Sequence, residues 1–96
     1  MRQYELMLVL KPQLDEEAID AVLARVEEIL TKQDGQVTNI NKWGKRRLAY
    51  EISDLTEGFY VVVNFTSTPA AAAELERVLK IADEPLRFLL IRENEE

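Results

Sequence analysis

The sequence predicts an α+β fold in which two helices pack on one face of a four-stranded antiparallel sheet. Apolar residues alternate along four segments, as in half-buried strands, and recur every three or four positions along two others, as in amphipathic helices. The six segments follow one another as β-α-β-β-α-β, which is the order of the ferredoxin-like sandwich. We therefore expect one such domain over residues 1–92, followed by a short acidic tail over residues 93–96.

The first expected strand covers residues 3–10. Its alternate apolar residues share one face: Tyr4, Leu6, Leu8 and Leu10. Asp15 is placed to cap a helix that runs to about Gln33, because its side chain can accept a hydrogen bond from the first helical turn. A single apolar stripe follows that helix, made of Ile19, Val22, Leu23, Val26, Ile29 and Leu30. Gly35 fits just past the helix end.

The second expected strand begins at Gln36 and is irregular. Val37 and Ile40 have opposite parity, so a flat strand cannot direct both side chains toward one core. We therefore expect a bulge or a strong twist between Thr38 and Asn41. Beyond it the alternation resumes, with one face formed by Leu48, Tyr50 and Ile52.

The remaining elements are marked by turn and capping residues. A polar turn is expected over residues 53–58, before a strand over residues 59–66 that is rich in valine and aromatic residues. Thr68 and Pro69 predict the start of the second helix, because a capping hydroxyl followed by proline favours the first helical turn. Pro85 ends that helix, and the last strand is expected over residues 86–91.

The composition excludes several classes of function. The chain has no His and no Cys, which removes the commonest general base, the commonest metal ligand and all thiolate chemistry. It also has no glycine-rich phosphate loop. We therefore expect no enzyme activity, no catalytic residues, no metal, no cofactor and no small-molecule substrate. No apolar run approaches the ~20 residues of a membrane span, and the N-terminus has no signal-peptide layout, so we expect a cytosolic protein without membrane contact.

A cluster of positive charge stands out in this acidic chain, whose formal net charge is −6. Lys42, Lys45, Arg46 and Arg47 lie within six positions, together with the only tryptophan, Trp43. Such a cluster predicts contact with an anionic partner, with the lysines and arginines meeting phosphates and an aromatic ring packing on a sugar or base. The alternative is a charged edge strand that resists pairing with other strands.

The sheet face that points away from the helices is the second anomaly. It is expected to carry six large apolar side chains: Met7, Val9, Tyr60, Val62, Leu89 and Ile91. An antiparallel sheet with one solvated face should alternate apolar with polar residues, so this face predicts a protein partner. Cover by the chain's own tail or by a second copy is the alternative. Tyr60 is the only ring expected on the third strand's open side, so stacking of single-stranded RNA across the sheet is not expected.

The basic stretch also carries a family resemblance. It reads Trp43-Gly44-Lys45-Arg46-Arg47-Leu48-Ala49-Tyr50-Glu51-Ile52 and closely resembles the most distinctive segment of the bacterial small-subunit ribosomal protein S6 family. The opening Met1-Arg2-Gln3-Tyr4-Glu5, the run Gly58-Phe59-Tyr60 and the closing segment from Glu84 to Arg92 resemble that family too. The resemblance covers essentially the whole chain. It implies a non-catalytic protein of the cytoplasmic ribosome.

The resemblance further implies binding to the central domain of the small-subunit (16S) rRNA, together with ribosomal protein S18 as a heterodimer. The residues expected on the RNA side are Arg2, Tyr4, Lys42, Trp43, Lys45, Arg46, Arg47 and Arg87. The residues expected on the protein-partner side are Met7, Tyr60, Val62, Leu89 and Ile91. The competing hypothesis is a ferredoxin-like regulatory or dimerisation module that binds a small ligand. It predicts a homodimer of the purified chain and no retention of RNA.

Overall fold

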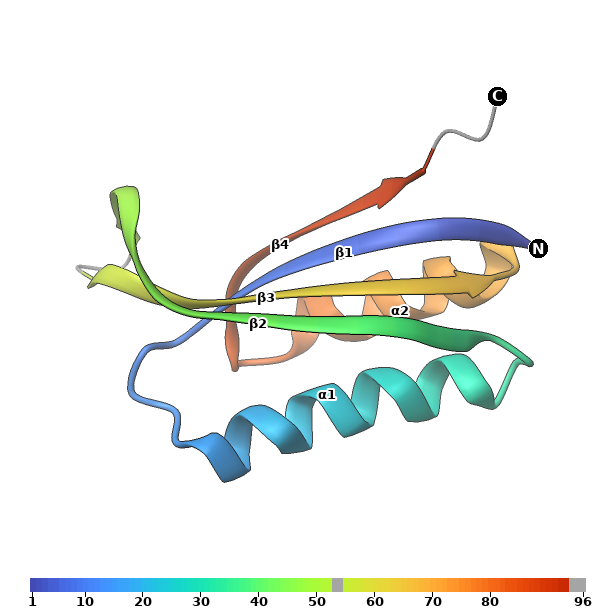
Figure 1. Ribbon diagram of the computed structural model, residues 1–96, viewed down its shortest axis with the longest axis horizontal. Helices are drawn as coiled ribbons and strands as arrows, with labels where there is room; N and C mark the ends of the chain where they lie inside the picture. Colours follow the sequence, from blue (N-terminus) through green and yellow to red (C-terminus); the bar gives the residue numbers. More distant parts are fainter. Residues whose placement is uncertain (53–54, 94–96) are drawn as a thin grey trace.

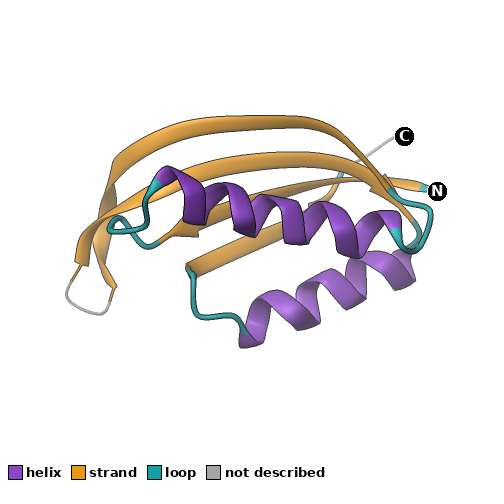
Figure 2. Cartoon of the chain, turned by 90° about the horizontal axis from the view of Figure 1, so that it is seen from below, coloured by secondary structure: helices purple, strands orange, loops and turns teal. Residues whose placement is uncertain are grey.

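The chain folds in the predicted order, strand, helix, strand, strand, helix, strand. The computed structural model describes residues 1–52 and 55–93, with side chains described for residues 1–48 and 56–93. The elements are β1 (Arg2–Leu10), α1 (Glu16–Thr31), β2 (Gln36–Ile52), β3 (Leu55–Ser67), α2 (Pro69–Ile81) and β4 (Pro85–Arg92). The strands form one antiparallel sheet in the order β2-β3-β1-β4, and both helices lie against one face (Figures 1 and 2). The predicted fold class is confirmed.

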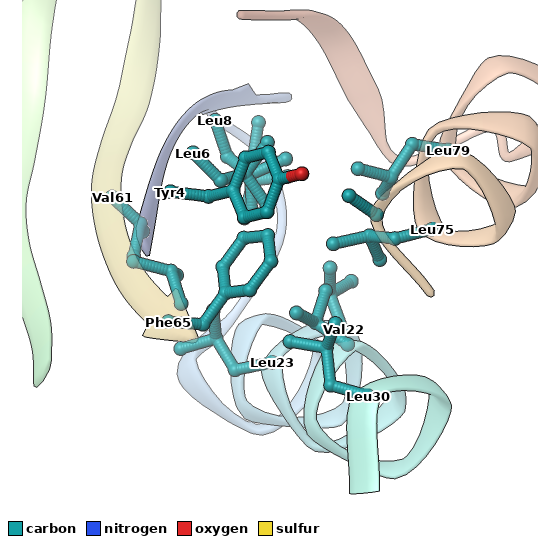
Figure 3. Packing of buried hydrophobic residues seen from close by; sticks show 14 of the residues in the cluster. Tyr4, Leu6, Leu8, Val22, Leu23, Leu30, Val61, Phe65, Leu75 and Leu79 are labelled. Carbon is teal, nitrogen blue, oxygen red and sulfur yellow. The ribbon is translucent and has the colours of Figure 1, made fainter. Parts of the chain in front are cut away.

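The core lies between the helices and the face of the sheet that β1 and β3 dominate. Leu6, Leu8 and Leu10 are fully buried on β1, as their alternation predicts. The rings of Tyr4 and Phe65 stack with centroids 5.2 Å apart and planes inclined by 18°. Figure 3 shows this ring pair facing the apolar stripes of α1 and α2. The burial of these side chains supplies most of the driving force that holds the two layers together.

Both helices begin as their sequences predict. The Ala18 N–H donates to Asp15 Oδ1 at 2.8 Å, and the Ala71 N–H donates to Thr68 Oγ1 at 3.2 Å. At the end of α1, the left-handed conformation falls on Asp34, with φ 66°, rather than on Gly35. Gly35 is needed there for space, because a Cβ at that position would lie 2.9 Å from the Leu30 carbonyl oxygen. Neither helix of the described chain is long and apolar enough to cross a membrane.

Between Gln36 and Arg47, strand β2 holds two more residues than the stretch of β3 with which it pairs. The register shifts between Val37 and Asn39, which confirms the predicted bulge, and between Lys42 and Gly44, which was not predicted. A further shift follows between Arg47 and Ile52. The first shift lets Val37 face Phe65 and Ile40 face Val63, so both point toward the helices. Their opposite parity is thereby resolved.

Strand β3 also begins earlier than predicted. It starts at Leu55, so residues 55–58 extend the β2–β3 pair and the prediction of a turn over them is wrong. The two other residues of that predicted turn, 53 and 54, lie outside the described residues. The physical reason is that β2 pairs with β3 as far as Arg47 opposite Glu57 and Ile52 opposite Leu55, and backbone hydrogen bonding outweighs the polar character of the segment.

We expect Leu75→Ala to lower the free energy of unfolding by about 2–5 kcal/mol, because it leaves a cavity at a fully buried position. The matched control is Ile81→Ala on the same helix, whose side chain is 72% exposed and should cost far less. Chemical denaturation of both variants measures the difference. Equal losses would show that α2 does not pack as described.

Candidate nucleic-acid and partner interface

The two lysines of the basic stretch point toward the helix side of the sheet. Lys42 lies opposite Val61, a core residue, and Lys45 lies opposite Phe59, which packs against the core. Directly opposite residues of an antiparallel pair share one face. Lys42 Nζ donates to Asp20 Oδ1 of α1 at 2.6 Å, and this hydrogen bond raises the pKa of the lysine. Lys42 therefore already has an anionic partner within the chain.

Trp43 points the other way. It is the extra residue between the Lys42–Val61 and Gly44–Tyr60 pairs, and its ring stacks on Tyr60 with centroids 6.3 Å apart and planes 10° from parallel. Gly44 follows with φ 92°, a backbone conformation that side chains with a Cβ rarely adopt. A Cβ there would meet no atom within 4 Å, so the glycine is required by the backbone conformation alone.

Arg46 joins Trp43 on the open face, whereas Arg47 does not. Arg46 lies opposite Gly58, two residues beyond the Gly44–Tyr60 pair, so its side chain emerges on the same face as that of Tyr60. Trp43, Arg46 and Tyr60 together line a shallow hollow of about 430 Å³. Arg47 lies opposite Glu57 and alternates to the helix side. The second bulge thus places Arg46 on the open face and leaves Lys42, Lys45 and Arg47 on the helix side.

The β2–β3 pair folds over part of the open face near its outer end. A Cβ on Gly58 would lie 2.5 Å from Val9 Cγ1 and 3.3 Å from Leu48 Cδ2, so these side chains converge above the glycine. Figure 1 shows this end of the pair rising on the side of the sheet away from the helices. Leu48 and Val9 are buried as a result. Val9 is therefore removed from the apolar surface that the sequence predicted to be open.

The other predicted apolar residues form a patch across three strands. Met7 lies opposite Val62 on one side and Leu89 on the other, which places the three side chains in one row. Val62 is buried by its neighbours, Met7 is half-buried, and Leu89 is 48% exposed. Ile91, two residues farther along β4, is 45% exposed. We call Met7, Val62, Leu89 and Ile91 the apolar patch.

The remaining predicted RNA contacts lie in three different places. Arg87 lies opposite Val9, which itself lies opposite Tyr60, so Arg87 belongs to the open face in the same cross-strand row as Tyr60. Arg2 is exposed at the start of β1, opposite Ser67 and at the far end of that strand from Leu10. Tyr4 is only 7% exposed and its ring stacks in the core. Its burial argues against the expected RNA contact, because that ring cannot reach a base.

Comparison with known proteins identifies the family. A family model described as ribosomal protein S6 matches residues 3–92. The small ribosomal subunit protein bS6 of Moorella thermoacetica is 50% identical over 96 residues, covering 100% of this chain and 98% of that protein. The chain belongs to the ribosomal protein S6 family.

Other members agree with this assignment. The bS6 protein of Desulforudis audaxviator is 50% identical over 94 residues, covering 98% of this chain and 100% of that protein. The crystal structure of the 30S ribosomal protein S6 of Thermotoga maritima matches with a TM-score of 0.88 and 30% identity, over 96% of this chain and 87% of that one. The predicted family is confirmed, and the chain is a protein of the small ribosomal subunit.

The S6-family chain thus joins an aromatic pair, two arginines and an apolar patch on one sheet face. The stacking of Trp43 on Tyr60 was not predicted from the sequence, although Trp43 belongs to the basic stretch. The signal was available, since a glycine inside a strand often marks a bulge. Gly44 is the only glycine within the predicted second strand.

We expect Gly44→Ala to cost about 1–2 kcal/mol of stability, because alanine is strained at this positive φ. It should also separate Trp43 from Tyr60, which near-ultraviolet circular dichroism detects through the ring stacking. Gly44→Asn serves as the control, because asparagine tolerates positive φ better and should retain more of both signals. Retention of the stacking signal by the alanine variant would contradict the role assigned to the glycine.

Proposed function

We propose that this chain is a non-catalytic structural component of the small ribosomal subunit that binds the central domain of 16S rRNA as a heterodimer with ribosomal protein S18, in the cytoplasmic ribosome. The observation that carries the proposal is the sheet face opposite the helices. One end of it presents Trp43, Arg46 and Arg87, and the apolar patch adjoins them. Membership of the S6 family supports the choice of a ribosomal partner for both parts.

The distribution of charge favours RNA at one surface only. The chain carries a formal net charge of −6, and the exposed carboxylates of α1 lie on the helix layer, among them Glu16, Glu17, Glu27 and Glu28. The open face instead receives Arg46 on β2 and Arg87 on β4, at the same end of the sheet. Phosphates are attracted to such a local positive region and repelled by the acidic helix, so the charges orient the chain on RNA.

The apolar patch favours a protein at the adjoining surface. Leu89 and Ile91 are about half exposed on edge strand β4, next to the half-buried Met7. Water is a poor solvent for contiguous side chains of this size, and covering them stabilises a complex by about 25 cal/mol per Å² of apolar surface buried. The hydrophobic contribution to heterodimer formation is therefore assigned to this patch.

A small-ligand module is less well supported. The groove between α1 and α2, lined in part by Val26, Ile29 and Leu79, has only about 10 Å³ of free space, which is too little for a ligand larger than water. The hollow beside Trp43 is open rather than enclosed, unlike a typical small-molecule pocket. A homodimer through the open face remains the competing outcome of the sedimentation experiment below.

Salt dependence of RNA binding tests the basic surface. We expect Arg46→Ala, measured in the complex with S18 and a 16S central-domain fragment, to reduce the slope of log affinity against log salt concentration by about one. Lys42→Ala should reduce it less, because the Lys42 ammonium is already bound by Asp20. A larger effect of Lys42→Ala would place the RNA on the helix side of β2.

Sedimentation tests the protein surface. We expect Leu89→Asp to weaken heterodimer formation about tenfold or more, because docking would bury an unpaired carboxylate. The matched control is Ile81→Asp, an equally apolar and 72% exposed position on the helix layer, which should leave the heterodimer unchanged. Analytical sedimentation of each variant with S18, and with S18 plus the RNA fragment, measures both. A wild-type chain that forms homodimers and retains no RNA would refute the proposal.

A further inference from the structure

The Trp43 ring is held as an open platform. One of its faces stacks on Tyr60, and the two rings are within 10° of parallel. Trp43 is nevertheless 44% exposed, and it lies on the edge strand β2, so no strand of the described sheet covers the side of the indole away from Tyr60. Tyr60 is itself half-buried beside the buried Val9, which fixes the lower ring in place. A flat ring that is supported from below and open above is suited to receive a third flat group.

The positive charge of Arg46 beside the Trp43 ring determines which chemical group can bind there. Arg46 lines the same hollow as Trp43 and Tyr60, and no carboxylate is among the residues that line it. Within residues 1–48 and 56–93, no carboxylate forms an ion pair with the Arg46 guanidinium. A guanidinium at the edge of the hollow repels a cationic side chain and attracts a phosphate. A nucleotide combines a flat base with a phosphate, so it matches both parts of the site.

We propose that the outer face of Trp43 is a stacking site for one unpaired base of an RNA, with Arg46 holding the phosphate of that nucleotide. The inference rests on the proposed binding of rRNA and specifies what this part of the surface recognises. A paired base inside a duplex hides both faces in the stack, so only a bulged, looped or terminal nucleotide can lie on the ring. Tyr60 supports the platform from below and does not contact the base.

The structure gives the open face one more ring than was expected for the third strand. Tyr60 alone offers a single ring, which is too little for stacking across the sheet. Trp43 of β2 adds a second ring from the neighbouring strand to the same face. Base–aromatic stacking of this kind accepts every base, because each has a π-face, so the site recognises an unpaired nucleotide rather than a particular sequence.

Fluorescence of the purified full-length chain tests the site directly, since Trp43 is the only tryptophan. Titration with adenosine 5′-monophosphate should quench it saturably, whereas free N-acetyltryptophanamide should show only linear, collisional quenching. Arg46→Ala should weaken the binding of the monophosphate but not that of adenosine, which has no phosphate. Linear quenching equal to that of the free indole compound would overturn the proposal.

Affinity for RNA in the complex with S18 distinguishes an RNA site from a site for free nucleotides. Trp43→Leu should weaken binding of a 16S central-domain fragment by about 5- to 150-fold, while Trp43→Phe, which keeps a flat ring, should lose less. Unchanged RNA affinity in Trp43→Leu would overturn this inference and leave the proposed function intact. Loss of S18 binding with unchanged RNA affinity would overturn it too, by assigning Trp43 to the protein interface. Failure of the wild-type complex to bind the fragment would refute the proposed function itself.

Discussion

The surface of this protein depends on the pairing of β2, between Gln36 and Arg47, with a stretch of β3 that is two residues shorter. Side chains alternate along a strand with a period of two, so each unpaired residue reverses the face to which the following side chains point. The first extra residue of β2 returns Ile40 to the core face after Val37. The second brings Arg46 to the open face, where Trp43 also points, while Lys42 stays on the helix side. Without the bulges, the same sequence would present a different surface.

The sequence predicts a structural feature where apolar or capping residues mark it, and fails where the residues are charged. The strands, helices and caps were predictable because apolar periodicity and capping chemistry act locally, as at Asp15 and Thr68. The first bulge was predictable because two apolar residues, Val37 and Ile40, disagree in parity. The second bulge lies among charged residues. Their side chains can be solvated on either face of the sheet, so they do not indicate which face each one occupies. Only Gly44 marked it.

Tyr4 and Val9 show that the alternation along a strand does not predict how exposed a residue is. Both residues follow the alternation of β1, yet their accessibility is decided by neighbours far away in the sequence. Phe65 of β3 stacks on the Tyr4 ring within the core, and the outer part of β2 covers Val9 from the open side. Parity assigns a residue to a face of a sheet, but exposure on that face depends on what the tertiary structure places above it. The structure is therefore needed to decide which of the contact residues inferred from the sequence are exposed.

The chemical character of the open face changes along its strands, and this order affects how protein and RNA would cooperate. Near the Tyr4 end of β1, the Asn64 amide donates to the Glu93 carboxylate at 3.0 Å, and Glu5 lies opposite Asn64. The apolar patch follows, and Arg46 and Arg87 lie beyond it. A protein docked on the patch would exclude water beside these arginines and so strengthen their attraction to phosphate. By thermodynamic linkage, bound RNA would then tighten the protein contact by the same factor. An acidic chain with few basic contacts of its own would in this way bind RNA chiefly as part of a complex.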